Sequence, residues 1–453
     1  MTCGFCFFAV YARATDRLDF PAFYCAGEAL DRHANPYLEM PLAACEQRVS
    51  TNALFRKHVV VPAPLPPYAL AAYAVVALLP YETSYRVDIM ASILALAASA
   101  RLLAGVTGVP VLALFATAFM ISSASILNGQ PIAFLLLALA AAGWSLQRGS
   151  DRGAACAAIA TLVEPHVGLG ICLALFFARP ATRPVFIAGA VMMTTVSIAV
   201  LAPKAISEYI YAVLPAHAAS EATLISQFSL TGLLVALGVP TRLALETASL
   251  QYVIMLILGV VYGRRAARYD RALLAYVPAL FAVIGGPFLH LTQVALALPA
   301  AALLARKIKS STSAAFALTA LFVDWTGWSA DWGNVLLMTV GTFTLVLLIG
   351  GRRRHALGSA VVVAMASASW THTVTPSLAS VRLFPIDPNA LAEVSWAAFI
   401  DTVRTSRGTM LLNTITKLPN WTTLMLFAVL AIEVGRTTGM GSTSAGRITP
   451  DAV

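Results

Sequence analysis

Residues 109–147 read VPVLALFATAFMISSASIL-NGQ-PIAFLLLALAAAGWSLQ, and Arg148 follows directly. The stretch holds two apolar runs, 109–127 and 131–147, separated by Asn128-Gly129-Gln130, and it contains no charged residue. A membrane-spanning helix needs about 20 mostly apolar residues. The stretch therefore predicts two helices that cross a bilayer, joined by a short polar turn.

The composition extends this prediction to the whole chain. Hydrophobic residues make up 59% of the sequence and charged residues only 11%, whereas an average soluble domain has about 45–50% and about 25%. This excludes a soluble enzyme and predicts an all-α polytopic membrane protein. With an anchor at Met1 to Ala12, we expect about 12 transmembrane helices, the others at 86–104, 109–127, 131–147, 185–202, 246–263, 272–287, 291–305, 313–330, 334–350, 356–373 and 421–435.

Positive charge sets the expected orientation. The net charge is +9, but the basic residues sit in short clusters between apolar runs, so they indicate cytoplasmic loops rather than nucleic-acid binding. The clusters are Arg148/Arg152, Arg179/Arg183, Arg264/Arg265/Arg268/Arg271, Arg306/Lys307/Lys309 and Arg352/Arg353/Arg354. Loops 13–85, 203–245 and 374–420 then lie outside, and 436–453 is expected to be a disordered cytoplasmic tail.

Two apolar segments do not fit as simple spans. Residues 153–178 have arginines at both ends, and Glu164-Pro165-His166 interrupts them. Because proline removes a helix donor and restricts the residue before it, we expect a re-entrant hairpin of two half-helices with Glu164 and His166 at its tip. Residues 65–80 are bounded by prolines and are expected to form an interfacial helix, as is the amphipathic stretch Leu391 to Val403.

Polar residues near the membrane indicate where chemistry takes place, and most of them fall on the outer side. Asp19 follows the first helix and opens a short amphipathic helix that carries Tyr24; a catalytic carboxylate and a helix N-cap both fit this position. Gln130 lies at the outer end of a span, as a ligand contact or as part of a turn.

The other candidates also have two readings. Glu164 and His166 need polar partners inside the membrane, and they can find them in a substrate or in each other. His290 is suited to bind phosphate or move a proton, or it is a structural histidine. Gln227 ends the second external loop. Cys25 and Cys45 share the first external loop, and the sequence leaves open whether they pair.

Several of these motifs together resemble glycosyltransferase family 87. They are Asp19 with its following aromatic residues and Tyr24, Asn35-Pro36-Tyr37, a Pro-Pro-x-x-Leu element, Gly129-Gln130 before a helix, and the proline-broken hairpin. The resemblance runs from about residue 1 to 305. It implies a GT-C catalytic module over 1–305, with a C-terminal transmembrane module at 306–435 and the tail at 436–453.

The resemblance also implies an activity. Family members transfer a sugar from a polyprenyl-phosphate carrier to a lipid or glycan acceptor at the outer face of the cytoplasmic membrane, with inversion and without a metal or other cofactor. Asp19 occupies the position of the general base. Candidate substrate-binding residues are Tyr24, Tyr37, Gln130, Glu164, His166, Gln227 and His290.

Two departures from the family pattern stand out. Glu164-Pro165-His166 replaces a Lys-Pro element, and Gly286-Pro287-Phe288-Leu289-His290 replaces a Ser-Pro-x-x-Trp stretch. The sequence also leaves two other classes open, a transporter or lipid-linked sugar flippase and a catalytically silent scaffold. A transporter favours an internal repeat, and none is visible by inspection.

Overall fold

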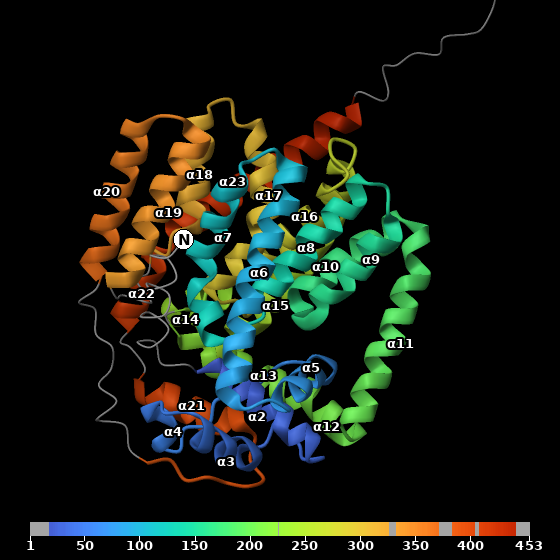
Figure 1. Cartoon of the computed structure of the whole chain (residues 1–453), viewed down its shortest axis with the longest axis vertical. Helices are drawn as coiled ribbons and strands as arrows, with labels where there is room; N and C mark the ends of the chain where they lie inside the picture. Colours follow the sequence, from blue (N-terminus) through green and yellow to red (C-terminus); the bar gives the residue numbers. More distant parts are fainter. Residues whose placement is uncertain (1–17, 225, 326–331, 371–382, 404–406, 441–453) are drawn as a thin grey trace, which may run out of the picture.

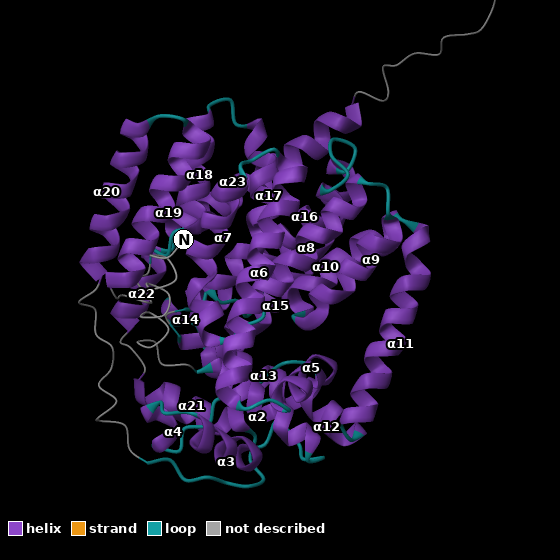
Figure 2. Cartoon of the chain, viewed as in Figure 1, coloured by secondary structure: helices purple, strands orange, loops and turns teal. Residues whose placement is uncertain are grey.

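The computed structural model describes residues 18–440, except residue 225 and the ranges 326–331, 371–382 and 404–406. The expected anchor at Met1 to Ala12 and most of the expected tail, 441–453, lie outside the described residues. Within these ranges the chain forms helices joined by loops, with two isolated β-bridges and no strand (Figure 2). The predicted all-α class is therefore confirmed.

A bundle of helices forms the upper part of the molecule in Figure 1. Its first members are α6 (Tyr81–Thr107), α7 (Val111–Asn128), α8 (Ile132–Gln147), α9 (Asp151–Ala160), η1 (Thr161–Val163), α10 (Pro165–Ala178), η2 (Pro180–Thr182), α11 (Arg183–Val200), α14 (Leu230–Ala236) and α15 (Thr241–Ala266). The rest are α16 (Leu273–Gly285), η5 (Leu291–Ala297), α17 (Leu298–Leu304), η6 (Ala305–Lys307), α18 (Ser311–Phe322), α19 (Trp332–Gly350), α20 (Arg353–Trp370), α22 (Arg407–Thr416) and α23 (Leu418–Met440).

Shorter helices form a layer below the bundle in Figure 1, which we call the outer layer. It consists of α2 (Asp19–Asp31), α3 (Glu39–Val49), α4 (Ala53–Arg56), α5 (Pro67–Ala77), α12 (Pro203–Glu208), η3 (Tyr209–Val213), α13 (Leu214–Ser220), η4 (Glu221–Thr223) and α21 (Ala392–Val403). α11 runs along one side of the molecule from the bundle to this layer.

Five helices of the described residues are long and apolar enough to cross a membrane: Tyr81–Thr107, Val111–Asn128, Pro180–Val200, Thr241–Ala266 and Leu418–Thr437. Several further apolar helices are shorter, among them α8, α10, α16 and α18. A membrane protein is thus supported, while the count of about 12 spans stays a prediction. The expected span 291–305 is not one α-helix, because the 3-10 helix η5 precedes the short α17.

Each part of the molecule has its own hydrophobic core. The bundle core surrounds α16, in which every residue is buried. The core of the outer layer joins aromatic residues of α2 to Trp396 and Phe399 of α21. The start of α21 and the segment before it are also tied to residues 37–57, since Ala392 N donates to Tyr37 O at 2.9 Å and Phe384 N donates to Lys57 O at 3.0 Å.

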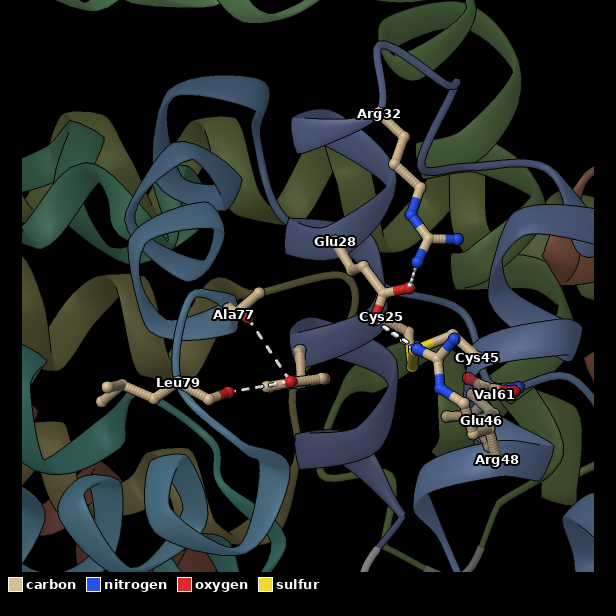
Figure 3. Close-up of a disulfide and its surroundings, with 10 residues drawn as sticks. Cys25, Glu28, Arg32, Cys45, Glu46, Arg48, Val61, Ala77 and Leu79 are labelled. Carbon is tan, nitrogen blue, oxygen red and sulfur yellow. Dashed lines mark hydrogen bonds and ion pairs between the residues drawn. A yellow bond between two sulfur atoms is a disulfide. The ribbon is translucent and has the colours of Figure 1, made fainter.

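Cys25 of α2 and Cys45 of α3 form a disulfide, which settles the pairing that the sequence leaves open (Figure 3). Beside it, Glu28 of α2 pairs with Arg32 at 2.6 Å and also with Arg48 of α3. On the other face of α2, Gly27 lies so close to the backbone of Tyr73 in α5 that a Cβ would collide with it. These contacts fix α2, the helix that begins with Asp19.

Candidate active site

A cavity of about 260 Å³ lies where the outer layer meets the bundle. Its walls come from segments far apart in the sequence. The polar residues lining it are Asp19, Gln130, Glu164, His166, Tyr209, His217, Glu221, His290, Gln293 and Trp396. Five of the eight residues proposed from the sequence therefore meet in one space: Asp19, Gln130, Glu164, His166 and His290.

Asp19 and Gln130 form the first polar contact of the cavity. Gln130 Nε2 donates to Asp19 Oδ2 at 2.6 Å, while Gln130 Oε1 accepts from Ser125 Oγ at 2.7 Å. Gly129 allows this approach, because its φ of +81° suits glycine and a Cβ would collide with Phe20. The amide is thus held with its NH₂ group toward the carboxylate.

Burial dominates the electrostatics of Asp19. It raises the pKa of the carboxyl group to about 6, although the hydrogen bond from Gln130 and the positive charge of His290 act in the opposite direction. Leu18, not Asp19, occupies the N-cap position of α2, and no side chain caps the helix. The N-cap explanation of Asp19 is therefore not what the structure shows.

His290 belongs to a second group of polar residues around Glu221. His290 Nε2 lies 3.1 Å from Glu221 Oε2, and Trp396 Nε1 donates to Glu221 Oε1 at 2.9 Å. His217 Nε2 lies 3.9 Å from the same carboxylate. Burial would raise the pKa of Glu221, but the imidazoles of His217 and His290 outweigh it and lower this pKa to about 2.

The predicted break in residues 153–178 is present, and its tip reaches the cavity. α9 and η1 end at Val163, and Pro165 begins α10, a position at which proline is well tolerated. Gln293 Nε2 donates to Glu164 Oε2 and lies 3.3 Å from His166 Nε2. Gln293 Oε1 accepts from His290 N at 2.8 Å, so this side chain links the hairpin tip to His290.

Tyr24, Tyr37 and Gln227 do not line the cavity. The hydroxyl of Tyr24 donates to Leu79 O at 2.9 Å, and the hydroxyl of buried Tyr37 donates to Leu65 O at 2.9 Å. Gln227 Oε1 accepts from Leu289 N at 2.9 Å, and residue 227 forms an isolated bridge with residue 290. These three side chains hold backbone segments, and their substrate contacts stay predictions.

Sequence reasoning missed His217, Glu221, Gln293 and Trp396. A signal existed for the first two, since an imidazole and a carboxylate four residues apart face the same side of a helix. Gln293 and Trp396 had no such signal. Among the described residues that line the cavity, none is Lys or Arg, so its three imidazoles, His166, His217 and His290, are the groups able to carry positive charge.

The helices of membrane length indicate a membrane protein, and the cavity between the outer layer and the bundle gives it a site with several polar residues in its wall. Residues 65–287 match the family model of glycosyltransferase family 87, and this match indicates a membrane glycosyltransferase. Comparison with curated proteins found no match, and comparison with solved structures found none either. The matched range includes Gln130, Glu164 and His166, whereas Asp19 and His290 lie outside it.

Proposed function

We propose that the protein transfers a hexose or pentose from a polyprenyl-phosphate donor to a lipid or glycan acceptor, with inversion at the anomeric carbon. The reaction takes place at the outer face of the cytoplasmic membrane. The observation that carries this proposal is the cavity that joins Asp19 to the family 87 domain through Gln130.

Asp19 acts as the general base. Gln130 holds Oδ2, which leaves Oδ1 for the proton of the acceptor hydroxyl. As that proton moves to Asp19, the acceptor oxygen bonds to the anomeric carbon from the side opposite the phosphate. The bond between this carbon and the phosphate oxygen breaks, and the carrier phosphate leaves with the electron pair. A carboxylate with a pKa near 6 is well matched to this role.

The charges of the cavity support a donor with one phosphate. A sugar phosphodiester carries one negative charge and a diphosphate carries two. The cavity has no Lys or Arg among its described lining residues. Burial lowers the pKa of His290, but the carboxylates of Glu221, Asp19 and Glu164 together outweigh it and raise this pKa. Burial lowers the pKa of His217. Because the Glu221 carboxylate already compensates the His290 imidazolium, the described lining has no surplus positive charge for a second phosphate.

Two features support an extracytoplasmic site. The Cys25–Cys45 disulfide lies in the outer layer next to the helix of Asp19, and disulfides persist in oxidising compartments. The arginine-containing links α10–α11 and α19–α20 lie at the opposite end of the bundle (Figure 1), and such links favour the cytoplasm.

Asp19→Asn tests the proposal, because the amide keeps the shape of the carboxylate but cannot take the proton. Transfer from radiolabelled polyprenyl-phosphate sugar to lipid acceptors in isolated membranes is expected to fall by about 10²–10⁴-fold. Asp31→Asn is the matched control at the exposed end of the same helix. Undiminished transfer by Asp19→Asn would refute the base, and absence of transfer by the wild type would refute the donor class.

A further inference from the structure

Glu221 is the centre of a four-residue cluster in the wall of the cavity. Its partners come from three other segments: His217 from α13, His290 from the link between α16 and η5, and Trp396 from α21. The Glu221 side chain is only 7% exposed. A buried carboxylate is costly unless it is paired, and the His290 imidazole at 3.1 Å is its nearest charge partner.

The cluster fixes the His290 ring at both nitrogens. Nε2 faces Glu221 Oε2 at 3.1 Å, and Nδ1 lies 3.2 Å from Ser226 Oγ. Phe288 packs edge-on against the ring, with 5.1 Å between the ring centroids. The Glu221 carboxylate beside Nε2 favours the doubly protonated form of the ring, and the Ser226 hydroxyl can accept from Nδ1–H in that form.

We propose that Glu221 is a positioning residue that keeps His290 as a fixed imidazolium in the cavity wall, where it stabilises the phosphate of the sugar donor. This inference rests on the proposed function and names the residue on which its donor recognition depends. His290 acts through its charge, since its ring nitrogens are already engaged. That charge opposes the negative charge that grows on the phosphate as it leaves.

Trp396 connects the cluster around Glu221 to the C-terminal part of the chain. Its indole N–H donates to the Glu221 oxygen that does not face His290. Trp396 lies more than 100 residues beyond the family 87 match, which ends at residue 287. α21 therefore completes a wall of the site by orienting the Glu221 carboxylate.

The pH dependence follows from the groups that face His290. Glu221 raises the pKa of His290 most strongly, and the more distant carboxylates of Asp19 and Glu164 add to this. Burial and the imidazoles of His166 and His217 oppose it. Without the Glu221 charge, burial dominates and His290 loses its proton at a lower pH. The alkaline limb of the activity profile then moves to lower pH.

Glu221→Gln tests the proposal, because the amide oxygen can still accept from Trp396 while the negative charge is gone. We expect the alkaline limb of transfer to move to lower pH, and at pH 8 the KM for the lipid-phosphate sugar to rise by about 10-fold, the loss of one charged contact. The KM for the acceptor should change little. Glu246→Gln, an exposed acid on α15, is the matched control.

If the KM for the donor and the alkaline limb are both unchanged in Glu221→Gln, the proposal is overturned while the proposed function stands. Absence of transfer by the wild type would instead contradict the function itself. If Glu221→Gln does not fold, ¹³C NMR of histidine-labelled wild-type protein decides, with His290→Gln used to assign the signal. Titration of His290 above the ordinary histidine pKa supports the ion pair, and titration at or below it refutes the proposal.

Discussion

Burial and nearby polar groups shift the pKa of Asp19 in opposite directions, and their balance sets the pH at which the carboxyl group loses its proton. Desolvation raises its pKa, and the Gln130 amide and His290 lower it. Because a base must be ionised to act, transfer is expected to fall as the pH drops below about 6. With an ordinary aspartate, the same decline would begin about two pH units lower.

Gln130→Met tests this balance, because methionine is of similar size but donates no hydrogen bond to the carboxylate. Loss of the contact at 2.6 Å should raise the pKa of Asp19, so the acid limb of kcat/KM for the acceptor should move above pH 6. Gln147→Met is the control, since Gln147 makes a similar contact with Asp270 at the other end of α8. An acid limb that moves downward or stays in place would contradict the pKa assigned to Asp19.

The sequence was sufficient to propose five of the cavity residues, because a polar side chain next to an apolar span is a strong signal by itself. Asp19, Gln130 and His290 are examples. It was not sufficient to propose Glu221 or Trp396, because their place in the cavity wall depends on a hydrogen bond between residues 175 positions apart. Such contacts depend on how the segments of the outer layer pack on each other, and hydropathy carries no information on this packing.

At the scale of elements, hydropathy predicted the positions of most helices but not whether each is an α-helix or a 3-10 helix. The range 291–305 is apolar except for Thr292 and Gln293, yet η5 and α17 divide it. The cause is local: His290 and Gln293 form a capping box at the start of η5, and Pro299 lies in the first turn of α17. An apolar side chain contributes equally to the mean hydropathy in a 3-10 helix and in an α-helix. Hydropathy therefore could not predict that this range divides into two helices.

The Cys25–Cys45 disulfide stabilises the pair of helices that includes the helix of Asp19. Its sequence separation is 20 residues, and closing a loop of this length stabilises a fold by about 3 kcal/mol, through the entropy of the unfolded chain. The double variant Cys25→Ser/Cys45→Ser should therefore lower the unfolding temperature of the detergent-solubilised protein. Cys156→Ser, which removes an exposed free thiol, should leave it unchanged. Equal unfolding temperatures for all three proteins would show that the bond contributes nothing.

At the scale of the whole molecule, the site depends on both ends of the chain. Residues 37–61 and the segment around α21 share hydrogen bonds and a hydrophobic core, and the range that matches family 87 lies between them in the sequence. The segment before α6 supplies Asp19, and α21 supplies Trp396. A chain that lacked α21 would expose the Glu221 carboxylate to water and weaken its hold on His290.

The sidedness of the molecule yields the last prediction. If the outer layer is extracytoplasmic, Thr51→Cys and Asn389→Cys should react with a membrane-impermeant maleimide in intact cells, because both positions are exposed in that layer. Arg352→Cys, in the link between α19 and α20, should react only after permeabilisation. The background carries Cys156→Ser, since that thiol is exposed. The reverse labelling pattern would place Asp19 on the cytoplasmic side, where a reducing environment disfavours the disulfide beside it.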